Sequence, residues 1–402
     1  MYIHHQNASL ILQFVNGKKT KVTNVSKESA ERNYRNGIWS STNENTLSKD
    51  LFDPESFYGN CPNIDWIHDI FPIISVFTTG GVISIIVTIF FERDYKSYTK
   101  DNDTFDDATE STKIELRVVA KKSNDVLSLK RSLYWEGILS TTAIQKKIRE
   151  EIKQINLYLS QYSIHEIQDP TKASIILPAG TGGIFVHEAI GHCLEADQYF
   201  KKDAVLNGYL GKTITNNKAI TISDSCCSTD MIKYKVSDDG SIPRSLTLVK
   251  DGCLENIMTD AYSSSIYGIA DSGNGRSANY YSFPIPRMRN TYIHNGTDKV
   301  EDIIKSTKYG LIPIDIQGGN VTVETGNFVF NISHALIIQS GEIVGISKPF
   351  LFSGNIINAI DSIERIGNDL KFCRDVCGKR GQLIDVAYGT PTILLSQRTH
   401  YE

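Results

Sequence analysis

Residues 182–198 read GGIFVHEAIGHCLEADQ and hold two histidines, His187 and His192, with Glu188 directly after the first. Neutral imidazoles bind zinc in hydrolases, and a carboxylate beside the zinc-activated water serves as the general base. In the usual zinc-peptidase helix the two histidines are four residues apart and share one helix face. The pattern therefore predicts a metal site with His187 and His192 as ligands and Glu188 as the catalytic base.

The spacing of five residues in this HExxxH pattern conflicts with a regular helix. At 3.6 residues per turn, the two side chains would diverge by about 140°. A wide π-helical turn could absorb the extra residue. Alternatively, the helix could kink or end at Gly191, where the missing Cβ permits unusual φ and ψ angles. The position of Gly191 directly before His192 favours the second solution, and both predict a local distortion.

A third ligand has to come from elsewhere in the chain. The candidates are His294, His334, Cys226, Cys227, Cys253, Cys373 and Cys377. Cys377 lies in a predicted turn and is followed by two cations, which would lower the pKa of its thiol and favour the thiolate ligand. A buried, inert cysteine is the alternative. These residue types alone do not rank Cys377 above Cys373.

The elements around the metal motif are mainly strands. Hairpins are predicted in residues 8–25 around Asn-Gly and in 113–135 around Ser-Asn-Asp, with a polar loop at 99–112 between strands. Residues 70–91 are uncharged and long enough to span a bilayer, but the Thr-Thr-Gly-Gly in their middle predicts another hairpin instead. Isoleucines at three- and four-residue steps predict a helix over 141–162.

A domain boundary is predicted near Pro170, where the helical pattern has ended. Beyond it, short strands alternate with glycine-rich turns, including hairpins around Asp251-Gly252 and Ser340-Gly341. The predicted fold class is α+β, with two domains of largely antiparallel sheet and a metal-binding helix that carries HExxxH. The domains are expected at 1–170 and 171–402.

Composition restricts the class of partner. The 402 residues are 40% hydrophobic and 22% charged, with a net charge of −4 and no long basic run, which argues against binding to nucleic acid. Seven scattered cysteines do not form a disulfide framework, and the first residues lack the pattern of a signal peptide. We therefore expect a cytoplasmic protein without a membrane segment.

Several motifs in order resemble one known family. GTGGIFVHEAIGHCLEAD is similar to the metal-binding segment of the TldD/PmbA metallopeptidases. GNGRS at 273, PIPRMRNTYI at 284, QGGNVTVETGNFVFNISHALII at 317, IGNDL at 366, VCGKRGQ at 376 and GTPTILL at 389 continue the resemblance. It covers roughly residues 175–395, whereas the N-terminal part matches weakly and is shorter than expected for the family.

The resemblance implies a function. The retained HExxxH motif is typical of the TldD-like type, whereas PmbA-like (TldE) chains have lost it. By position, the family's zinc ligands would be His187, His192 and Cys377. The resemblance further implies a heterodimer with a PmbA/TldE-like subunit, which degrades peptides or removes a leader from ribosomally made natural-product precursors. We therefore expect a zinc-dependent peptidase.

Further residues are candidates for supporting roles. Glu195 and Asp197 could accept hydrogen bonds from the ligand imidazoles, or could simply be capping or solvated acids. Gly318 and Gly319 precede a strand pattern. The two glycines indicate either that an extended peptide substrate approaches this strand closely or that the strand contains a plain β-bulge. Arg276 could fix a substrate carboxylate, as could Arg287 and Arg289.

Two other functions remain open from the residues alone. The chain could be a non-catalytic scaffold with a structural metal, which would require a fourth protein ligand such as His334 or Cys193. It could also be a metal-free hydrolase that uses Cys377 as its nucleophile.

Overall fold

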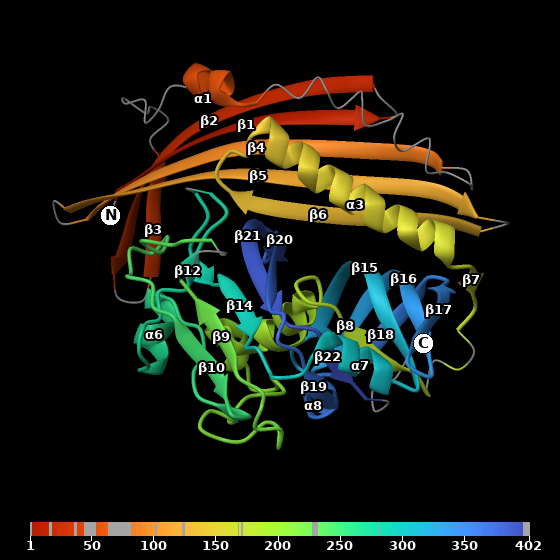
Figure 1. Cartoon of the computed structure of the whole chain (residues 1–402). Coiled ribbons are helices and arrows are strands. Elements are labelled where there is room, and N and C mark those ends of the chain that lie inside the picture. Colours follow the sequence, from red (N-terminus) through yellow and green to blue (C-terminus); the bar gives the residue numbers. More distant parts are fainter. Residues whose placement is uncertain are drawn as a thin grey trace. The chain divides into compact units, whose positions relative to one another are not determined.

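The structure is a computed structural model that describes residues 2–15, 18–35, 38–43, 54–62, 82–100, 103–122, 125–167, 169, 172–226, 232–279 and 281–396. The chain divides into two compact units (Figure 1). The first consists of Met1–Arg32 with Ser41–His165, and the second of Asn33–Ser40 with Glu166–Glu402.

The first unit is built on a sheet with the strand order β3-β2-β1-β4-β5-β6, except that the end of β2 and the start of β3 fall within Asn33–Ser40 and are assigned to the second unit. Its strands are β1 Tyr2–Val15, β2 Lys18–Arg35, β3 Ile38–Asn43, β4 Val82–Lys100, β5 Asp103–Lys122 and β6 Asp125–Glu136. Its helices are α1 Pro54–Asn60 and α3 Thr141–Gln161, which is followed by the short strand β7 Ile164–His165. β2, β1, β4, β5 and β6 pair antiparallel in that order.

The predicted helix is confirmed as α3. The side chain of Ser140 accepts a hydrogen bond from the amide of Ala143 and caps its N-terminus. The isoleucines at the predicted steps, 144, 148, 152 and 155, are all buried. Contacts of Arg131 with Glu151, and of Lys122 with the carbonyl groups near the end of α3, attach the helix to β5 and β6.

The predicted hairpins β1/β2 and β5/β6 are also confirmed. The predicted loop at 99–112 is wrong, because β4 and β5 continue as a paired ladder down to Lys100 and Asp103. Backbone pairing outweighs the low strand propensity of the acidic residues there, which are exposed or half-buried. The first half of the hairpin predicted within residues 70–91 lies outside the described residues. Within the described chain, no helix combines the length and apolarity that a bilayer span requires.

Two larger sheets form the second unit. One has the order β11-β10-β9-β14-β21-β20, and the other contains β19-β22-β8-β15-β16-β17, with β18 also pairing with β16. Their strands are β8 Ser174–Leu177, β9 Ile222–Ser225, β10 Leu246–Lys250, β11 Cys253–Leu254, β14 Asn290–Ile293, β15 Tyr309–Thr322, β16 Asn327–Gln339, β17 Glu342–Ser347, β18 Phe350–Asn355, β19 Ile363–Ile366, β20 Lys371–Lys379, β21 Gln382–Thr390 and β22 Ile393–Leu395. The remaining elements are the short pair β12 Gly275–Arg276 and β13 Ile285–Pro286, and helices α6 Ala261–Tyr267, α7 Val300–Ser306 and α8 Ile356–Asp361.

The pairing in this unit is largely antiparallel. The exceptions among the described pairs are β14 with β21 and β15 with β8, which are parallel. The hairpins predicted at Asp251-Gly252 and Ser340-Gly341 are confirmed, and both residues of each turn have positive φ. The chain is therefore sheet-rich α+β, as predicted.

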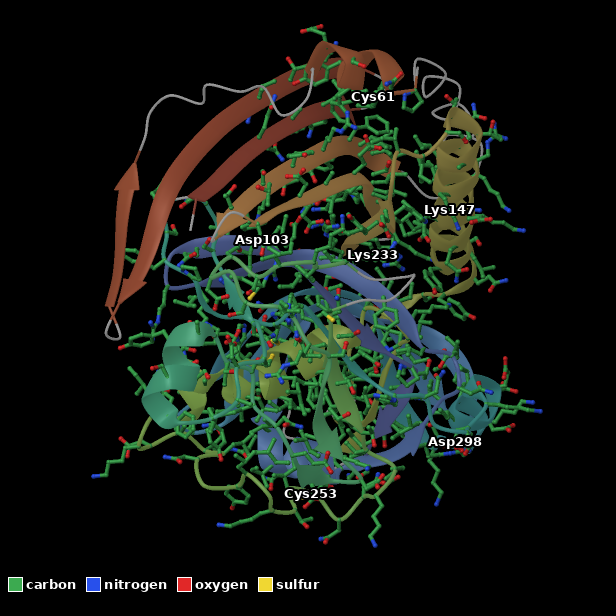
Figure 2. All side chains as sticks on the ribbon, turned by 90° about the vertical axis from the view of Figure 1, so that its left-hand side faces the viewer. Cys61, Asp103, Lys147, Lys233, Cys253 and Asp298 are labelled. Atoms are coloured by element: carbon green, nitrogen blue, oxygen red, sulfur yellow. The ribbon has the colours of Figure 1, made fainter. Side chains whose placement is uncertain are left out.

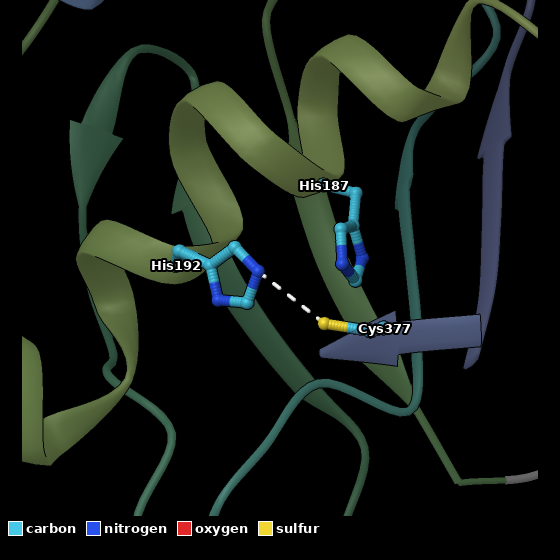
Figure 3. Close-up of side chains that lie close together, drawn as sticks. All are labelled: His187, His192 and Cys377. Carbon is cyan, nitrogen blue, oxygen red and sulfur yellow. Dashed lines mark hydrogen bonds between the residues drawn. The ribbon is translucent and has the colours of Figure 1, made fainter. Parts of the chain in front are cut away.

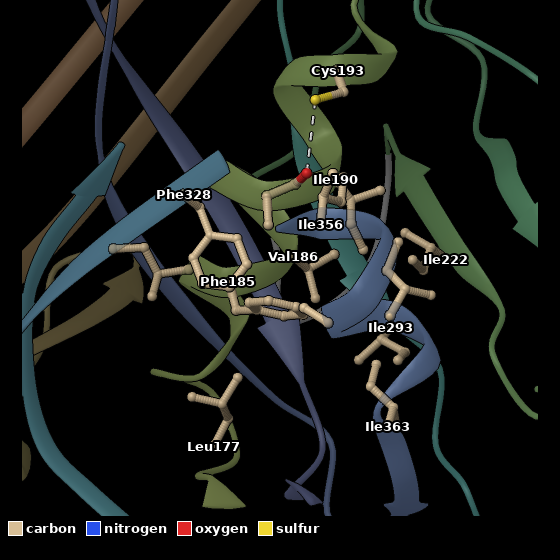
Figure 4. Close-up of a cluster of buried hydrophobic side chains, with 14 of the residues drawn as sticks. Leu177, Phe185, Val186, Ile190, Cys193, Ile222, Ile293, Phe328, Ile356 and Ile363 are labelled. Carbon is tan, nitrogen blue, oxygen red and sulfur yellow. Dashed lines mark hydrogen bonds between the residues drawn. The ribbon is translucent and has the colours of Figure 1, made fainter. Parts of the chain in front are cut away.

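A short helical segment runs through the core of the second unit. It consists of α4 Gly183–Phe185, the π-helix η3 Val186–Gly191, the 3₁₀ helix η4 His192–Leu194 and α5 Ala196–Tyr199. The ring centroid of Phe185 lies 5.6 Å from that of Phe328 (Figure 4) and 6.4 Å from that of Phe330. Val186, Ile190 and other apolar residues of the segment are buried in the same cluster. This apolar face fixes the segment, so that its polar residues are held on the opposite side.

Candidate metal centre

The conflict between the five-residue spacing and a regular helix is resolved by a π-helical turn. The backbone N–H of His192 donates to the carbonyl oxygen of His187, five residues earlier, and also to that of Ile190. This bond closes the wide turn that brings both histidines to one side of the segment. Gly191 has ordinary helical angles, φ −58° and ψ −50°. The favoured explanation, a kink through unusual angles at Gly191, is therefore wrong.

Gly191 serves packing instead. A Cβ atom at this position would lie 2.0 Å from Sδ of Met288, whose side chain is 1% exposed. The buried methionine sulfur thus occupies the volume that any larger residue would need. The glycine lets the helical segment approach the chain just before β14 closely.

We expect Gly191→Ala to destabilise the protein by about 1–3 kcal/mol, because the added methyl overpacks the site. Denaturant unfolding measures this loss. Gly59→Ala is the matched control, since a Cβ at Gly59 meets no heavy atom within 4 Å. Equal midpoints for the two variants would contradict the packing role of Gly191.

The side chains of His187, His192 and Cys377 converge, two from the helical segment and one from β20 (Figure 3). One ligand atom from each lies within 4.8 Å of the other two. Sγ of Cys377 is 3.4 Å from Nε2 of His192. A tetrahedral zinc with bonds of about 2.0–2.3 Å would hold a nitrogen and a sulfur about 3.5 Å apart. The donor types and this spacing fit zinc.

A second observation supports the fit. The imidazole of His187 is 2% exposed, and its Nδ1 has no hydrogen-bond partner among the described residues. A buried polar atom without a partner is costly unless something absent from the protein chain satisfies the group. The His187 ring lies 5.0 Å from the His192 ring, at 78° to it. Two imidazoles crossed in this way can direct a nitrogen each toward a common point.

The other candidate ligands lie elsewhere. His294 bonds Ser223, His334 bonds the carbonyl of Ser347, and Cys226 lies beside Ser245. Figure 2 shows Cys253 at the outer edge of its unit.

Cys193 points into the core, toward the carbonyl of Ala189, as expected for the neighbour of His192 (Figure 4). Cys227 lies outside the described residues. Among the described His, Cys, Asp and Glu side chains, the three-residue cluster is the group that could hold an ion.

Cys377 is ionised more readily than an ordinary thiol. Burial would raise its pKa, but hydrogen bonds and positive charge from His187 and His192 outweigh burial and lower the pKa to about 5. The expected turn at Cys377 is wrong, because the residue lies inside β20, and the hairpin turn follows at Arg380-Gly381. The expected stabilisation by the two following cations is replaced by the imidazoles.

Glu195 holds His192 in place. Its fully buried Oε2 lies 2.8 Å from Nδ1 of His192, so Nε2 is left to face Cys377. Burial disfavours the charged imidazole, but Glu195 and Cys377 raise the pKa of His192 to about 10. Burial would also raise the pKa of Glu195, yet Lys379 and His192 hold it well below its usual range. Asp197 does not reach an imidazole; it binds Lys379 and Arg380 instead.

Glu188 lies beside the ligand cluster. Its Oε2 is 3.7 Å from Nε2 of His192, and its side chain is 18% exposed. Burial raises the pKa of its carboxyl group, against the opposing charges of the two histidines. A partly exposed carboxylate at this position is suited to proton transfer.

The cluster forms part of the wall of a pocket of about 360 Å³. Glu188, Gly318 and Gly319 also line it. Gly318 has a φ of +94°, and β15 carries a bulge between Ile316 and Gly319. A Cβ at Gly319 would lie 2.2 Å from the ring of Phe330. The two glycines therefore form a bulge, as one of the sequence alternatives expected, and the structure also places them at the pocket.

The structure does not bring Arg276 to this pocket. Its guanidinium is buried, donates to the carbonyl groups of Met288 and Asp385, and lies over the ring of Tyr234. Arg287 and Arg289 are almost fully buried and also bond main-chain carbonyl groups. The guanidinium groups instead bond main-chain carbonyl groups of strands and loops in the second unit, so a role of these arginines in fixing a substrate carboxylate stays a prediction without support from the structure. Nothing in a Gly- and Pro-rich sequence distinguishes these two uses of arginine.

Sequence reasoning missed several polar residues at the pocket, namely Gln198, Asn320 and Asp375. Oε1 of Gln198 is buried and has no hydrogen-bond partner within the described chain, so it can accept a donor from a ligand. Gln198 follows the metal motif by six residues, and Asp375 precedes Cys377 by two. Proximity in sequence to the predicted ligands was the available signal.

Comparison with known proteins assigns most of the second unit to a described protein family. Residues 170–400 match the family described as PmbA/TldA metallopeptidase C-terminal domain. A metalloprotease TldD homolog from Buchnera aphidicola of Acyrthosiphon pisum is 34% identical over 227 residues, 56% of this chain and 47% of the relative. A zinc metalloprotease TldD homolog from Saccharolobus solfataricus is 30% identical over 316 residues, 75% of this chain and 67% of the relative.

The fold has a solved counterpart. The crystal structure of TldE from Thermococcus kodakarensis superposes with a TM-score of 0.75 and 15% identity, covering 100% of this chain and 96% of that one. The chain spans about half the length of the first curated relatives that it matches. The match over 170–400, more than half of the residues, nevertheless carries the assignment. The chain belongs to the TldD/PmbA family of metallopeptidases.

Proposed function

We propose that this chain is a zinc-dependent peptidase of the TldD type. His187, His192 and Cys377 hold the zinc ion, and Glu188 is the general base. The observation that carries the proposal is the convergence of two imidazoles and a thiol of lowered pKa at the wall of a pocket that also holds Glu188. We assign residues 171–402 as the metallopeptidase domain and 1–170 as the N-terminal domain.

A zinc ion held by these three side chains would keep a coordination position for water, as catalytic zinc sites require. When bound, zinc would supply a Lewis acid that polarises the scissile carbonyl and acidifies the attacking water. Glu188 accepts the proton of that water at its carboxylate and delivers it to the leaving amine nitrogen. Glu195 keeps His192 in one orientation through Nδ1 throughout these steps.

The pocket is bordered by strand edges that suit an extended peptide. β15 pairs with β8 at Gly310 and Leu311 and with β16 along its length, so the described pairs leave its 318–321 stretch bonded on one side. β20, which carries Cys377, is the last strand of its sheet. A peptide substrate can add to such an edge through main-chain hydrogen bonds. We therefore place the substrate backbone along Gly318 and Gly319.

We further propose that the chain works with a PmbA/TldE-like subunit, on peptides or on the leader of a ribosomal natural-product precursor. This part rests on membership of the family and on the names of the relatives, which describe TldD-type metalloproteases.

We expect removal of metal to abolish peptide cleavage, and zinc to restore it. The chain and its PmbA/TldE-like partner would be treated with a chelator, freed from it, and assayed on a peptide mixture by mass spectrometry, with zinc or magnesium added back. Cleavage that survives chelation but is blocked by a thiol alkylator would contradict the proposal and support a cysteine hydrolase.

A further inference from the structure

Lys379 lies beside the candidate zinc ligands but is neither a ligand nor a catalytic group in the function proposed above. It is two residues after Cys377 on β20, so both side chains emerge on one face of the strand. Both are buried, with 5% exposure for Cys377 and 8% for Lys379. The strand thus presents a thiol and an ammonium group side by side to the helical segment.

The ammonium group of Lys379 has three close acceptors. Its Nζ lies 2.9 Å from Oε2 of Glu195, 2.6 Å from Oδ1 of Asp197 and 2.9 Å from the carbonyl oxygen of Pro286. A lysine ammonium has three N–H donors. All three are therefore used within the protein, and none is left for a substrate group, although Lys379 lines the pocket.

Glu195 connects the ammonium group of Lys379 to His192, one of the three candidate zinc ligands. The same atom, Oε2, lies 2.8 Å from Nδ1 of His192, while Oε1 accepts the backbone N–H of Met288 at 3.2 Å. Glu195 is completely buried, so its charge depends on these partners for compensation. The contacts run without a break from Lys379 through Glu195 to His192.

We propose that Lys379 is a positioning residue that ties β20 to the helical segment and so sets the distance between Cys377 and His192. The ligands come from elements 185 residues apart in sequence, and their relative position depends on contacts between β20 and the segment. Lys379 supplies such a contact two residues from the sulfur. This inference rests on the proposed zinc site and predicts that the residue governs zinc affinity through Glu195.

The test is zinc affinity, measured on the full-length chain by competition with a chromophoric chelator. We expect Lys379→Met to weaken zinc binding about 10- to 100-fold, the usual effect of removing a partner behind a ligand. Arg380→Met is the matched control. Arg380 is the next cation and also contacts Asp197, at 3.0 Å, but its side chain is 55% exposed and makes no ion pair with Glu195 within the described residues. Its loss should change affinity less than about two-fold.

A double-mutant cycle tests the route through Glu195. If Lys379 acts through that carboxylate, adding Lys379→Met to Glu195→Gln should cost little further affinity. Glu195→Gln and the double variant bury no unpaired carboxylate, so they keep the test available if Lys379→Met alone fails to fold. Two results would overturn the inference. One is a zinc affinity of Lys379→Met equal to that of the parent chain. The other is a zinc affinity of the double variant about ten-fold or more below that of Glu195→Gln.

Because zinc affinity is measured without a substrate, this result is separate from the test of peptidase activity. A chain that binds zinc in the Lys379-dependent manner but cleaves nothing would leave the inference standing and refute the proposed function. A lower kcat in Lys379→Met with unchanged zinc affinity would instead show that the ammonium acts on the substrate, which overturns the inference.

Discussion

Glu188→Gln is expected to reduce peptide cleavage by about 10²- to 10⁴-fold, the usual contribution of a general base. The amide has nearly the same shape as the carboxylate but cannot accept the proton of the attacking water. Glu188 is not one of the three converging ligand groups, so the zinc content should not change. The measurement is kcat/KM on a cleaved peptide, together with zinc per chain after gel filtration.

The control for this substitution is Glu324→Gln, which removes a carboxylate that pairs with Lys201 on the surface. It should leave both activity and zinc content unchanged. Two outcomes for Glu188→Gln would count against the mechanism. Undiminished cleavage would remove Glu188 as the base, and loss of zinc would mean that this carboxylate is itself a ligand. If no peptide is cleaved even by the parent chain with its partner, a non-catalytic scaffold becomes the better description.

The sequence predicted the larger features of the fold because their signals are local. The isoleucine spacing of α3 and the turn residues of the hairpins each act within a few neighbouring residues. The prediction of a loop at the acidic stretch 103–112 is wrong for the converse reason. Its strand conformation depends on a ladder with β4, which composition does not reveal.

The candidate site was predictable to a similar extent. The His187–His192 spacing required a distortion, but Gly191, which suggested a kink, is explained by its close packing against Met288, a residue 97 positions further along the chain. Cys377 could not be ranked above Cys373 from chemistry alone, and only the resemblance to a family selected it. In the structure, Cys377 reaches the histidines, whereas Cys373 lies near Gly180.

Arginines were the least predictable class. A guanidinium in a loop can bind a ligand or fill the hydrogen-bonding needs of nearby carbonyl groups, and the sequence looks the same in both cases. Arg276 and Arg287 turned out to serve main-chain carbonyl groups. Glu195 shows the opposite outcome, since a sequence-level expectation of contact with a ligand imidazole corresponds to a 2.8 Å hydrogen bond.

Cys377→Ala is expected to remove most of the bound zinc and, with it, peptidase activity. Structural zinc sites with four ligands bind with about 10–16 kcal/mol, which is about 2.5–4 kcal/mol per ligand. Loss of the thiolate should therefore weaken binding about 60- to 700-fold. The effect should be a loss of zinc on gel filtration and of the cobalt–thiolate charge-transfer band in the cobalt-substituted protein.

Cys373→Ala is the matched control, because it removes a thiol from the same strand four residues earlier. It should keep zinc, the cobalt–thiolate band and activity. The pair of variants also separates the two chemical roles open to Cys377. A nucleophilic cysteine could be lost without loss of the metal, whereas a ligand could not. Cys377→Ala protein that retains its zinc at parental affinity but cleaves nothing would therefore reassign this residue from ligand to nucleophile, despite its 3.4 Å approach to His192.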